Sequence, residues 1–207
     1  LEELGYQFKD NSEDLKADLE KGNICFLHAP LFHPALKSVA PLRKQLGLKT
    51  FFNILGPLVN PVRPDFTMIG VANLEIARVY QYLLQKQKSE FMIVHALDGY
   101  DEISLTGDTK IISKTGEKIY SAEDLKFKNV SPESIFGGES KEDAAKLFIK
   151  ILEGNGTEEQ NAVVLANASI ALQNTGKFGD YEDCLSLAIQ SLEGGKALKS
   201  LRSIIND

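Results

Sequence analysis

The spacing of apolar residues predicts a strand, a helix and a second strand between residues 66 and 95. Residues 66–71 and 90–95 are largely apolar runs of strand length, and residues 74–87 between them repeat with a helical period. The apolar face expected of that helix is formed by Ile76, Val79, Tyr80, Leu83 and Leu84. This order is typical of a right-handed crossover that joins two parallel strands.

Shorter patterns predict the elements of the N-terminal part. Ser12 precedes two acidic residues and is expected to cap a helix that Gly22 ends. Residues 24–27 form a continuous apolar run, which we interpret as a buried strand. A further helix is expected over residues 34–46, broken or kinked at Pro41.

The second half of the chain predicts a hairpin followed by helices. Residues 103–120 alternate with polar turns, a pattern typical of antiparallel strands. Capping signals at Ser140, Thr157 and Asp180 each precede a helical pattern. We therefore expect a single α/β domain over residues 1–207, with a central, mostly parallel sheet, a hairpin-like antiparallel addition and flanking helices.

Composition narrows the class of protein. The chain is 43% hydrophobic, enough for a sizeable core, and its net charge of −6 argues against a nucleic-acid surface. Cys25 and Cys184 lie far apart, which is typical of reduced thiols in a cytoplasmic protein, and no apolar run reaches membrane-spanning length. We interpret three Asn-x-Ser/Thr triplets, at Asn129, Asn155 and Asn167, as chance matches.

Residues 33–61 contain the first candidates for a binding site, in the stretch HPALKSVAPLRKQLGLKTFFNILGPLVNP. The guanidinium of Arg43 has a fork geometry that matches a carboxylate or phosphate, although a lone arginine is more often a solvated helix residue. His33 stands before a proline at an expected helix start, where it could donate to a ligand. A structural role for His33 is the alternative.

An acidic loop is the second candidate site. Asp101 and Glu102 follow the strand expected over residues 90–95, and ligands bind at the carboxyl edge of parallel strands in open α/β sheets. Their carboxylates are hard oxygen ligands suited to a Mg²⁺ ion that bridges to substrate phosphates. A charged turn with no ligand is the alternative. No glycine-rich phosphate-binding loop is present in these residues.

Three stretches together resemble the anthranilate phosphoribosyltransferase family. Residues 33–61 are similar to that family's pattern HPAMKxVAPVRxELGxRTxFNLLGPLxNP. The stretch VHALDGYDEIS resembles VHGxDGLDEIS, and EEQNAVVLANASIAL resembles the family helix xxxxxVxLNAAxAL. The resemblance covers nearly the whole chain and implies the catalytic-domain fold shared by nucleoside phosphorylases and these phosphoribosyltransferases.

The resemblance also implies an activity and a set of site residues. The family transfers the phosphoribosyl group from phosphoribosyl pyrophosphate to anthranilate in tryptophan biosynthesis, releasing pyrophosphate. Arg43 falls on the arginine that meets the anthranilate carboxylate, with His33, Gly56 and Pro57 in the same pocket. Asp101 and Glu102 fall on the acidic pair that holds Mg²⁺ at the pyrophosphate. The resemblance implies no separate catalytic acid or base, and it implies a homodimer for the full-length protein.

Departures from the family pattern qualify this expectation. The family's Gly-Thr-Gly-Gly-Asp loop, its Lys-His-Gly-Asn segment and most of its N-terminal helical domain lie upstream of the matched region. We therefore expect this chain to be the C-terminal α/β domain, inactive alone. His28 stands where the family commonly has an aromatic residue.

The sequence leaves two other functions open. A pyrimidine nucleoside phosphorylase shares the expected architecture, but its substrates do not call for Arg43 or for the acidic pair. A noncatalytic nucleic-acid-binding relative of the same fold is disfavoured by the charge of −6.

Overall fold

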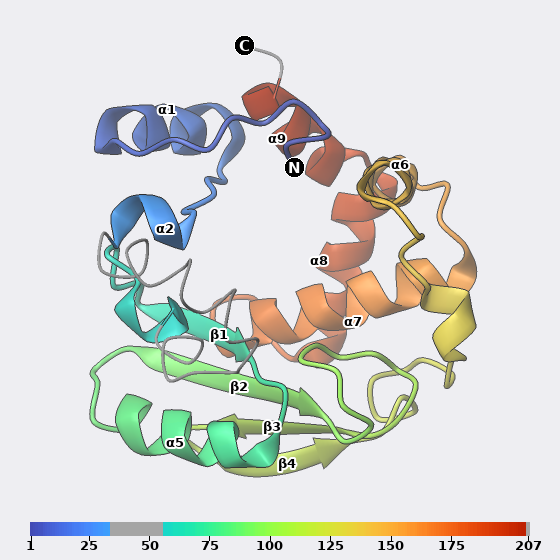
Figure 1. Cartoon of the computed structure of the whole chain (residues 1–207). Helices are drawn as coiled ribbons and strands as arrows, with labels where there is room; N and C mark the ends of the chain where they lie inside the picture. Colours follow the sequence, from blue (N-terminus) through green and yellow to red (C-terminus); the bar gives the residue numbers. More distant parts are fainter. Residues whose placement is uncertain (34–55, 206–207) are drawn as a thin grey trace. The chain divides into compact units, whose positions relative to one another are not determined.

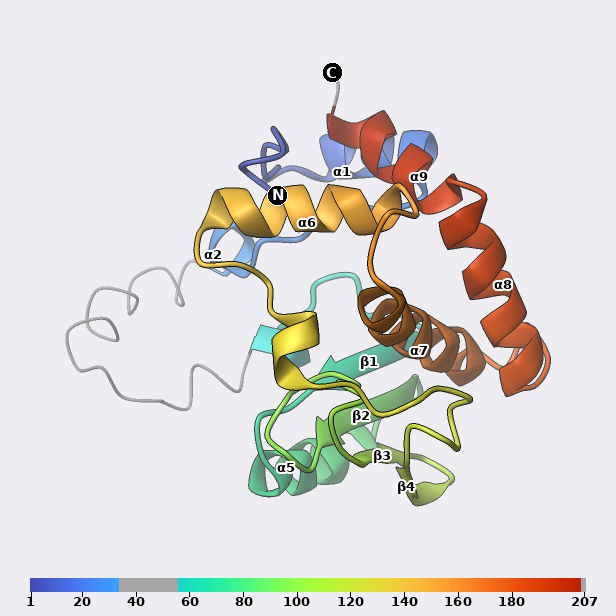
Figure 2. The same cartoon turned by 90° about the vertical axis from the view of Figure 1, so that its right-hand side faces the viewer.

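The computed structural model describes residues 1–33 and 56–205, which divide into two compact units. Unit 1 comprises Leu1–Arg63 and Ala197–Asp207, and unit 2 comprises Pro64–Lys196. Figures 1 and 2 show the elements of each. The helix expected over residues 34–46 lies outside the described residues, and the single-domain organisation stays a prediction.

Unit 2 is built on a four-stranded sheet in the order β1-β2-β3-β4. Strand β1 (Phe66–Gly70) pairs in parallel with β2 (Glu90–Ala96), and helix α5 (Leu74–Leu84) connects them, which confirms the predicted strand–helix–strand unit. Strands β3 (Thr109–Ser113) and β4 (Gly116–Tyr120) form the predicted antiparallel hairpin.

The sheet is mixed, with helices on both faces, which confirms the α/β class. One of its three pairings is parallel and two are antiparallel, because the hairpin contributes half of the described strands, so the sheet is not mostly parallel as predicted. Helix α7 covers one face and α5 the other (Figure 2). The α7 face holds the main core cluster, to which β2 contributes Met92 and Val94 and α7 contributes Ala166 and Ile170.

Helix α5 turns a narrower face to the sheet than its sequence predicts. Its buried residues are Ala77, Tyr80 and Leu84, whereas Val79 and Leu83 are 46% and 40% exposed. The helix is rotated about its axis so that these three residues are buried, which leaves the two larger side chains outside the contact. The prediction that Val79 and Leu83 belong to the buried face is therefore wrong.

The remaining helices of unit 2 begin where their capping signals predict. A 3₁₀ turn, η2 (Pro132–Ile135), precedes helices α6 (Lys141–Leu152), α7 (Glu158–Asn174) and α8 (Tyr181–Glu193). The Ser140 side chain accepts a hydrogen bond from the Asp143 N–H, and Thr157 and Asp180 each form a reciprocal capping box. Caps satisfy the first free N–H groups of a helix within one turn, so they can be recognised locally.

Unit 1 contains helices α1 (Ser12–Gly22), α2 (Ala29–Phe32) and α9 (Lys196–Ile205), with the 3₁₀ turn η1 (Gly56–Val59). Its first helix is capped by Asn11, whose side chain accepts from the Asp14 N–H, and it ends at Asn23 in the left-handed conformation. The predicted caps, Ser12 and Gly22, are each one residue inside the helix.

Gly22 instead permits close packing between α1 and α9. A Cβ atom at this position would lie 2.7 Å from Ser203 Oγ and 2.8 Å from the Ser200 carbonyl oxygen. The glycine therefore serves a helix–helix contact rather than a helix end.

The prediction of a strand over residues 24–27 is also wrong, because this segment has no regular secondary structure and pairs with none of the described strands. Its apolar character serves side-chain packing: the Phe26 ring meets the Tyr6 ring edge-on, with centroids 5.1 Å apart.

Candidate functional site

The acidic pair Asp101–Glu102 lies in the loop of residues 97–108, which joins β2 to β3 (Figure 1). This loop starts at the carboxyl end of β2, beside the carboxyl end of the parallel strand β1. Both acidic residues are exposed, and neither carboxylate has an ion pair or hydrogen bond with any residue that the structure describes. Two exposed carboxylates, unpaired within the described part of the chain, therefore lie at the edge of the sheet where α/β proteins bind ligands.

Backbone hydrogen bonds give the acidic loop a defined shape. The Ala96 N–H donates to the Tyr100 carbonyl oxygen at 2.9 Å, and the Gly99 N–H donates to the Ala96 carbonyl oxygen at 2.9 Å. The Leu97 N–H donates to the Asp108 carbonyl oxygen at 2.8 Å, which joins the two ends of the loop. Gly99 has a φ of +110°, a conformation that strongly favours glycine in this tight turn.

A third acid of the loop, Asp98, is occupied within it. The Thr106 hydroxyl donates to the Asp98 carboxylate and lies 2.7 Å from the Ser104 hydroxyl. Gly107 leaves room for this contact, since a Cβ atom there would lie 3.3 Å from the Asp98 carboxylate. Asp98 thus braces the loop, while Asp101 and Glu102 are left available to a ligand.

The acidic pair is suited to a hydrated divalent cation and does not form a complete metal cage. No group of three or more His, Cys, Asp and Glu side chains positioned to hold a metal occurs within residues 1–33 and 56–205. Mg²⁺ commonly binds through one or two carboxylates, with water and substrate phosphates as its other ligands. The chemistry of the donor set therefore fits Mg²⁺ held jointly with a phosphorylated substrate.

The predicted substrate-binding residues belong to a different segment. His33 is half-buried at the C-terminus of α2, where its N–H donates to the Ala29 carbonyl oxygen at 3.0 Å. Gly56 begins η1 and is partly exposed, and Pro57 follows it in that turn. Arg43 and the Pro57 side chain lie outside what the structure describes.

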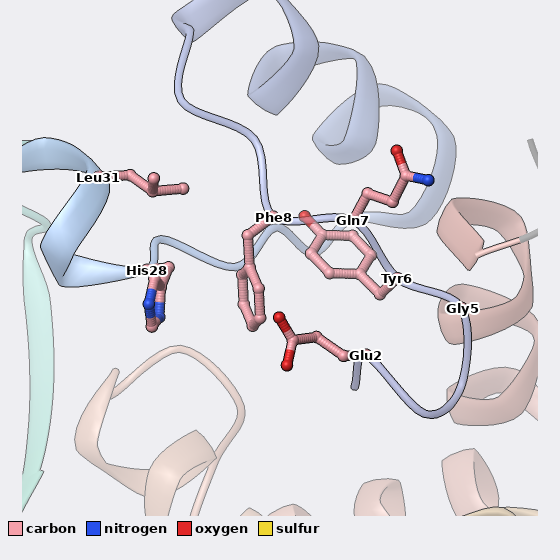
Figure 3. Close-up of a pocket in the computed structure, with 7 residues that line it drawn as sticks. All are labelled: Glu2, Gly5, Tyr6, Gln7, Phe8, His28 and Leu31. Carbon is pink, nitrogen blue, oxygen red and sulfur yellow. The ribbon is translucent and has the colours of Figure 1, made fainter.

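Unit 1 also contains an open cavity of about 510 Å³ (Figure 3). It is lined by Glu2, Gly5, Tyr6, Gln7, Phe8, His28 and Leu31, and so by none of the predicted site residues. The rings of Phe8 and His28 stack at its wall, with centroids 4.8 Å apart and planes inclined by 33°. The imidazole of His28 therefore takes a packing position that an aromatic ring could also occupy.

Asp18 of α1 is fully buried and has two polar partners, one of which, Tyr6, lines this cavity. Its carboxylate accepts a hydrogen bond from the Tyr6 hydroxyl at 2.8 Å and forms an ion pair with Lys9. Burial, followed by the bond to Asp18, raises the pKa of Tyr6 to about 12. Burial and the Asp18 charge also raise the pKa of the Cys25 thiol. Such a thiol is a poor nucleophile, so we assign this cluster to the packing of unit 1.

Two residues that support the acidic loop were not identified from the sequence. Gly70, at the end of β1, lies against the backbone of Asp101, and Asn167, on α7, is hydrogen-bonded to Ile103. The only sequence signals were a glycine at the end of a predicted strand and an asparagine inside a helix, where asparagine is unfavourable. Asn167 is far inside α7, where its Nδ2 donates to the Val163 carbonyl oxygen.

Comparison with protein families and with individual proteins shows what the chain is similar to. Residues 1–198 match the profile of the glycosyl transferase family, a/b domain. An anthranilate phosphoribosyltransferase from Bacteroides fragilis is 46% identical over 205 residues, which are 99% of this chain and 62% of that protein. The corresponding protein of Flavobacterium johnsoniae is 47% identical over 204 residues, again 62% of its length.

Solved structures resemble the chain over the same extent. Anthranilate phosphoribosyltransferase from Saccharomyces cerevisiae, in complex with PRPP (phosphoribosyl pyrophosphate) and Mg, matches with a TM-score of 0.88 and 26% identity, covering 99% of this chain and 59% of that one. The Thermus thermophilus enzyme matches with a TM-score of 0.87 and 30% identity, covering 98% and 61%. The chain thus spans about three fifths of the length of these relatives. None of the helices in the described residues is long and apolar enough to cross a membrane.

Proposed function

The chain belongs to the glycosyl transferase family by its a/b domain, and on that premise we propose that it supplies the α/β part of an anthranilate phosphoribosyltransferase. The proposed reaction breaks the bond between ribose C1 and the pyrophosphate oxygen of phosphoribosyl pyrophosphate. It forms a bond between C1 and the anthranilate nitrogen, which loses a proton, and pyrophosphate leaves. The step belongs to tryptophan biosynthesis.

The observation that carries this proposal is the exposed acidic pair at the carboxyl edge of the sheet. Asp101 and Glu102 are exposed and without partners among the described residues, on a loop that hydrogen bonds hold in shape. A solved relative of the same fold carries PRPP and Mg. We assign Asp101 and Glu102 as the residues that hold Mg²⁺ at the pyrophosphate group.

When bound, Mg²⁺ neutralises charge that builds up on the departing pyrophosphate. The chain contributes by placing the two carboxylates, which would hold the cation from the loop as hard oxygen ligands. Because the leaving group is a stabilised polyanion, positioning and charge neutralisation carry the reaction without a dedicated acid or base.

We assign anthranilate recognition to Arg43, with His33, Gly56 and Pro57 lining the same site. The planar guanidinium of Arg43 can donate two parallel hydrogen bonds to the anthranilate carboxylate. Support for this assignment comes from the sequence of residues 33–61 and from an anthranilate analogue bound in a relative, the Saccharomyces cerevisiae enzyme with 4-fluoroanthranilate.

The proposal extends to the setting of the protein. Its partners are the two small substrates rather than nucleic acid, in keeping with the net charge of −6, and no membrane is involved. Cys25 and Cys184 are both free, as expected of a cytoplasmic protein. The intact protein is proposed to be a homodimer.

The test is a transfer assay on the intact protein. Anthranilate is fluorescent, so its consumption can be followed with phosphoribosyl pyrophosphate and Mg²⁺, and we expect none when either is left out. Phosphorolysis of uridine with inorganic phosphate serves as the comparison. Nucleoside cleavage without anthranilate consumption would overturn the proposal.

A further inference from the structure

The side chain of Asn167, on α7, is hydrogen-bonded to the backbone next to the acidic pair. Its Nδ2 donates to the Ile103 carbonyl oxygen at 2.8 Å, and its Oδ1 accepts from the Ile103 N–H at 3.0 Å. An antiparallel strand would form the same two bonds with a facing residue. Since Ile103 directly follows Glu102, the side-chain amide holds the backbone one residue from the acidic pair.

The orientation of this amide is determined by a third bond. Nδ2 also donates to the Val163 carbonyl oxygen, one turn earlier in α7, at 2.9 Å. Both Nδ2 hydrogens are then used, and Oδ1 accepts from Ile103. Rotating the amide by half a turn would set the NH₂ group against the Ile103 N–H and the oxygen against two carbonyl groups, so only one orientation is favourable.

The Ile103 side chain is attached to the same helix. It is fully buried in the core cluster that includes Ala166 and Ile170 of α7. Backbone and side chain of Ile103 are therefore both fixed to α7, whereas Asp101 and Glu102 project into solvent. The acidic loop is thus held to α7 at its middle, at the residue that follows Glu102.

We propose that Asn167 is a positioning residue for Mg²⁺ and its diphosphate ligand, acting through Ile103 on the orientation of Asp101 and Glu102. This inference rests on the proposed function. Residues that orient metal ligands commonly change metal affinity by about 10- to 100-fold when replaced. Asn167 is expected to act at the lower end of that range, because it holds the ligands through the backbone rather than directly.

The test uses two substitutions and a matched control in the intact protein. Asn167→Ala removes all three hydrogen bonds. Asn167→Asp keeps the size of the side chain but sets an oxygen against the carbonyl groups of Ile103 and Val163. The control is Asn174→Ala, since Asn174 lies on the same helix and donates to a backbone carbonyl, that of Thr67 at 3.4 Å, outside the acidic loop.

Three measurements separate positioning from general stability. Binding of Mn²⁺ in the presence of inorganic pyrophosphate, followed by electron paramagnetic resonance, reports the metal site without turnover. Steady-state kinetics gives the apparent Mg²⁺ constant and the KM for anthranilate. Hydrogen exchange of residues 97–108 reports the order of the loop.

For both Asn167 variants we expect Mn²⁺ binding and the apparent Mg²⁺ constant to weaken by about tenfold. The anthranilate KM should stay within about twofold of the unsubstituted value, and exchange in residues 97–108 should quicken. Asn174→Ala should leave the metal constants unchanged. If Asn167→Ala does not fold, the result for Asn167→Asp tests the inference. If neither variant folds, Asn167 is a stability residue and the inference is wrong.

Equal weakening by Asn167→Ala and Asn174→Ala would overturn the inference, as would a parallel rise of the metal constant and the anthranilate KM. The same measurements distinguish a failure of this inference from a failure of the proposed function. An unsubstituted protein that transfers no phosphoribosyl group, yet loses Mn²⁺ affinity through Asn167→Ala alone, would support the positioning role and refute the anthranilate reaction.

Discussion

Gly70 and Asp101 approach each other so closely that no other residue fits at position 70 without displacing the loop. A Cβ atom on Gly70 would lie 1.9 Å from the Asp101 carbonyl oxygen and 2.9 Å from its carbonyl carbon. These atoms belong to the backbone and cannot move aside as a flexible side chain would. The end of β1 therefore determines how near the acidic loop can come to the sheet.

Gly70→Ala should accordingly move the Asp101 backbone. We expect a loss of about 1–3 kcal/mol in the free energy of unfolding, as for other overpacked sites, together with weaker Mg²⁺ activation of the intact protein. Urea unfolding and Mg²⁺ titration of the initial rate measure the two effects. Gly137→Ala is the control, because nothing lies within 4 Å of a Cβ atom there. An unchanged Mg²⁺ constant for Gly70→Ala would show that the loop adapts.

The acidic pair itself gives a second prediction. Asp101→Asn or Glu102→Gln removes a charged oxygen ligand, so we expect at least a tenfold rise in the apparent Mg²⁺ constant, on the order of 1.4 kcal/mol or more in binding. Folding stability should change by less than about 0.5 kcal/mol, since both side chains are exposed. Glu139→Gln, at another exposed acid, is the control. A normal Mg²⁺ constant in both variants would place the metal elsewhere.

Arg43 gives a third prediction, specific to one substrate. Arg43→Lys keeps the charge but loses the planar pair of donors, so anthranilate binding should weaken by about 1.5–3 kcal/mol, or roughly tenfold to more than a hundredfold. The constant for phosphoribosyl pyrophosphate should stay nearly unchanged. Kinetics in which each substrate is varied in turn measures both values. An equal rise in the two constants would make Arg43 a phosphate-binding or structural residue.

The buried pair of Tyr6 and Asp18 gives a prediction for stability at high pH. Because the pKa of Tyr6 is raised from 10.0 to about 12, the folded protein holds the phenol proton more tightly than the unfolded chain does. This contribution is complete below pH 10 and is lost as the pH rises through about 12. The free energy of unfolding should therefore fall across this interval.

The substitution Tyr6→Phe tests this assignment. It should cost about 1–3 kcal/mol at neutral pH, because the Asp18 carboxylate loses a buried partner, and it should flatten part of the alkaline decline. The rest of the decline belongs to other buried groups, among them Tyr181, whose pKa burial raises to about 12, and Tyr80, whose pKa burial also raises. Urea unfolding between pH 7 and 12 provides the measurement, because this range includes the ordinary tyrosine pKa of about 10. An identical alkaline decline in Tyr6→Phe would assign the effect to other groups.

Elements with local signals were correctly predicted from the sequence. The caps at Thr157 and Asp180 involve residues within one turn of the helix start, so the sequence contains the whole interaction. The same holds for β1, α5 and β2, whose periodic apolar patterns are long enough to distinguish helix from strand.

Predictions failed where the local structure depends on contacts with distant parts of the chain. Gly22 looks like a helix end until α9 is seen to pack against it, and residues 24–27 look like a strand although no described strand pairs with them. On α5, the exposure of Val79 and Leu83 depends on how the helix is rotated against β2. Each outcome depends on a neighbour that the local sequence does not contain.

The candidate site divides in the same way. The sequence by itself determined that Asp101 and Glu102 follow a strand, and that their carboxylates suit Mg²⁺, since both facts concern neighbouring residues. Only the tertiary structure decided that Gly70 backs the loop and that Asn167 holds Ile103 across 64 residues of chain. Hydrogen bonds and close contacts of this kind depend on atoms that meet only when helix and sheet pack together. The spacing of residues in the sequence therefore does not predict them.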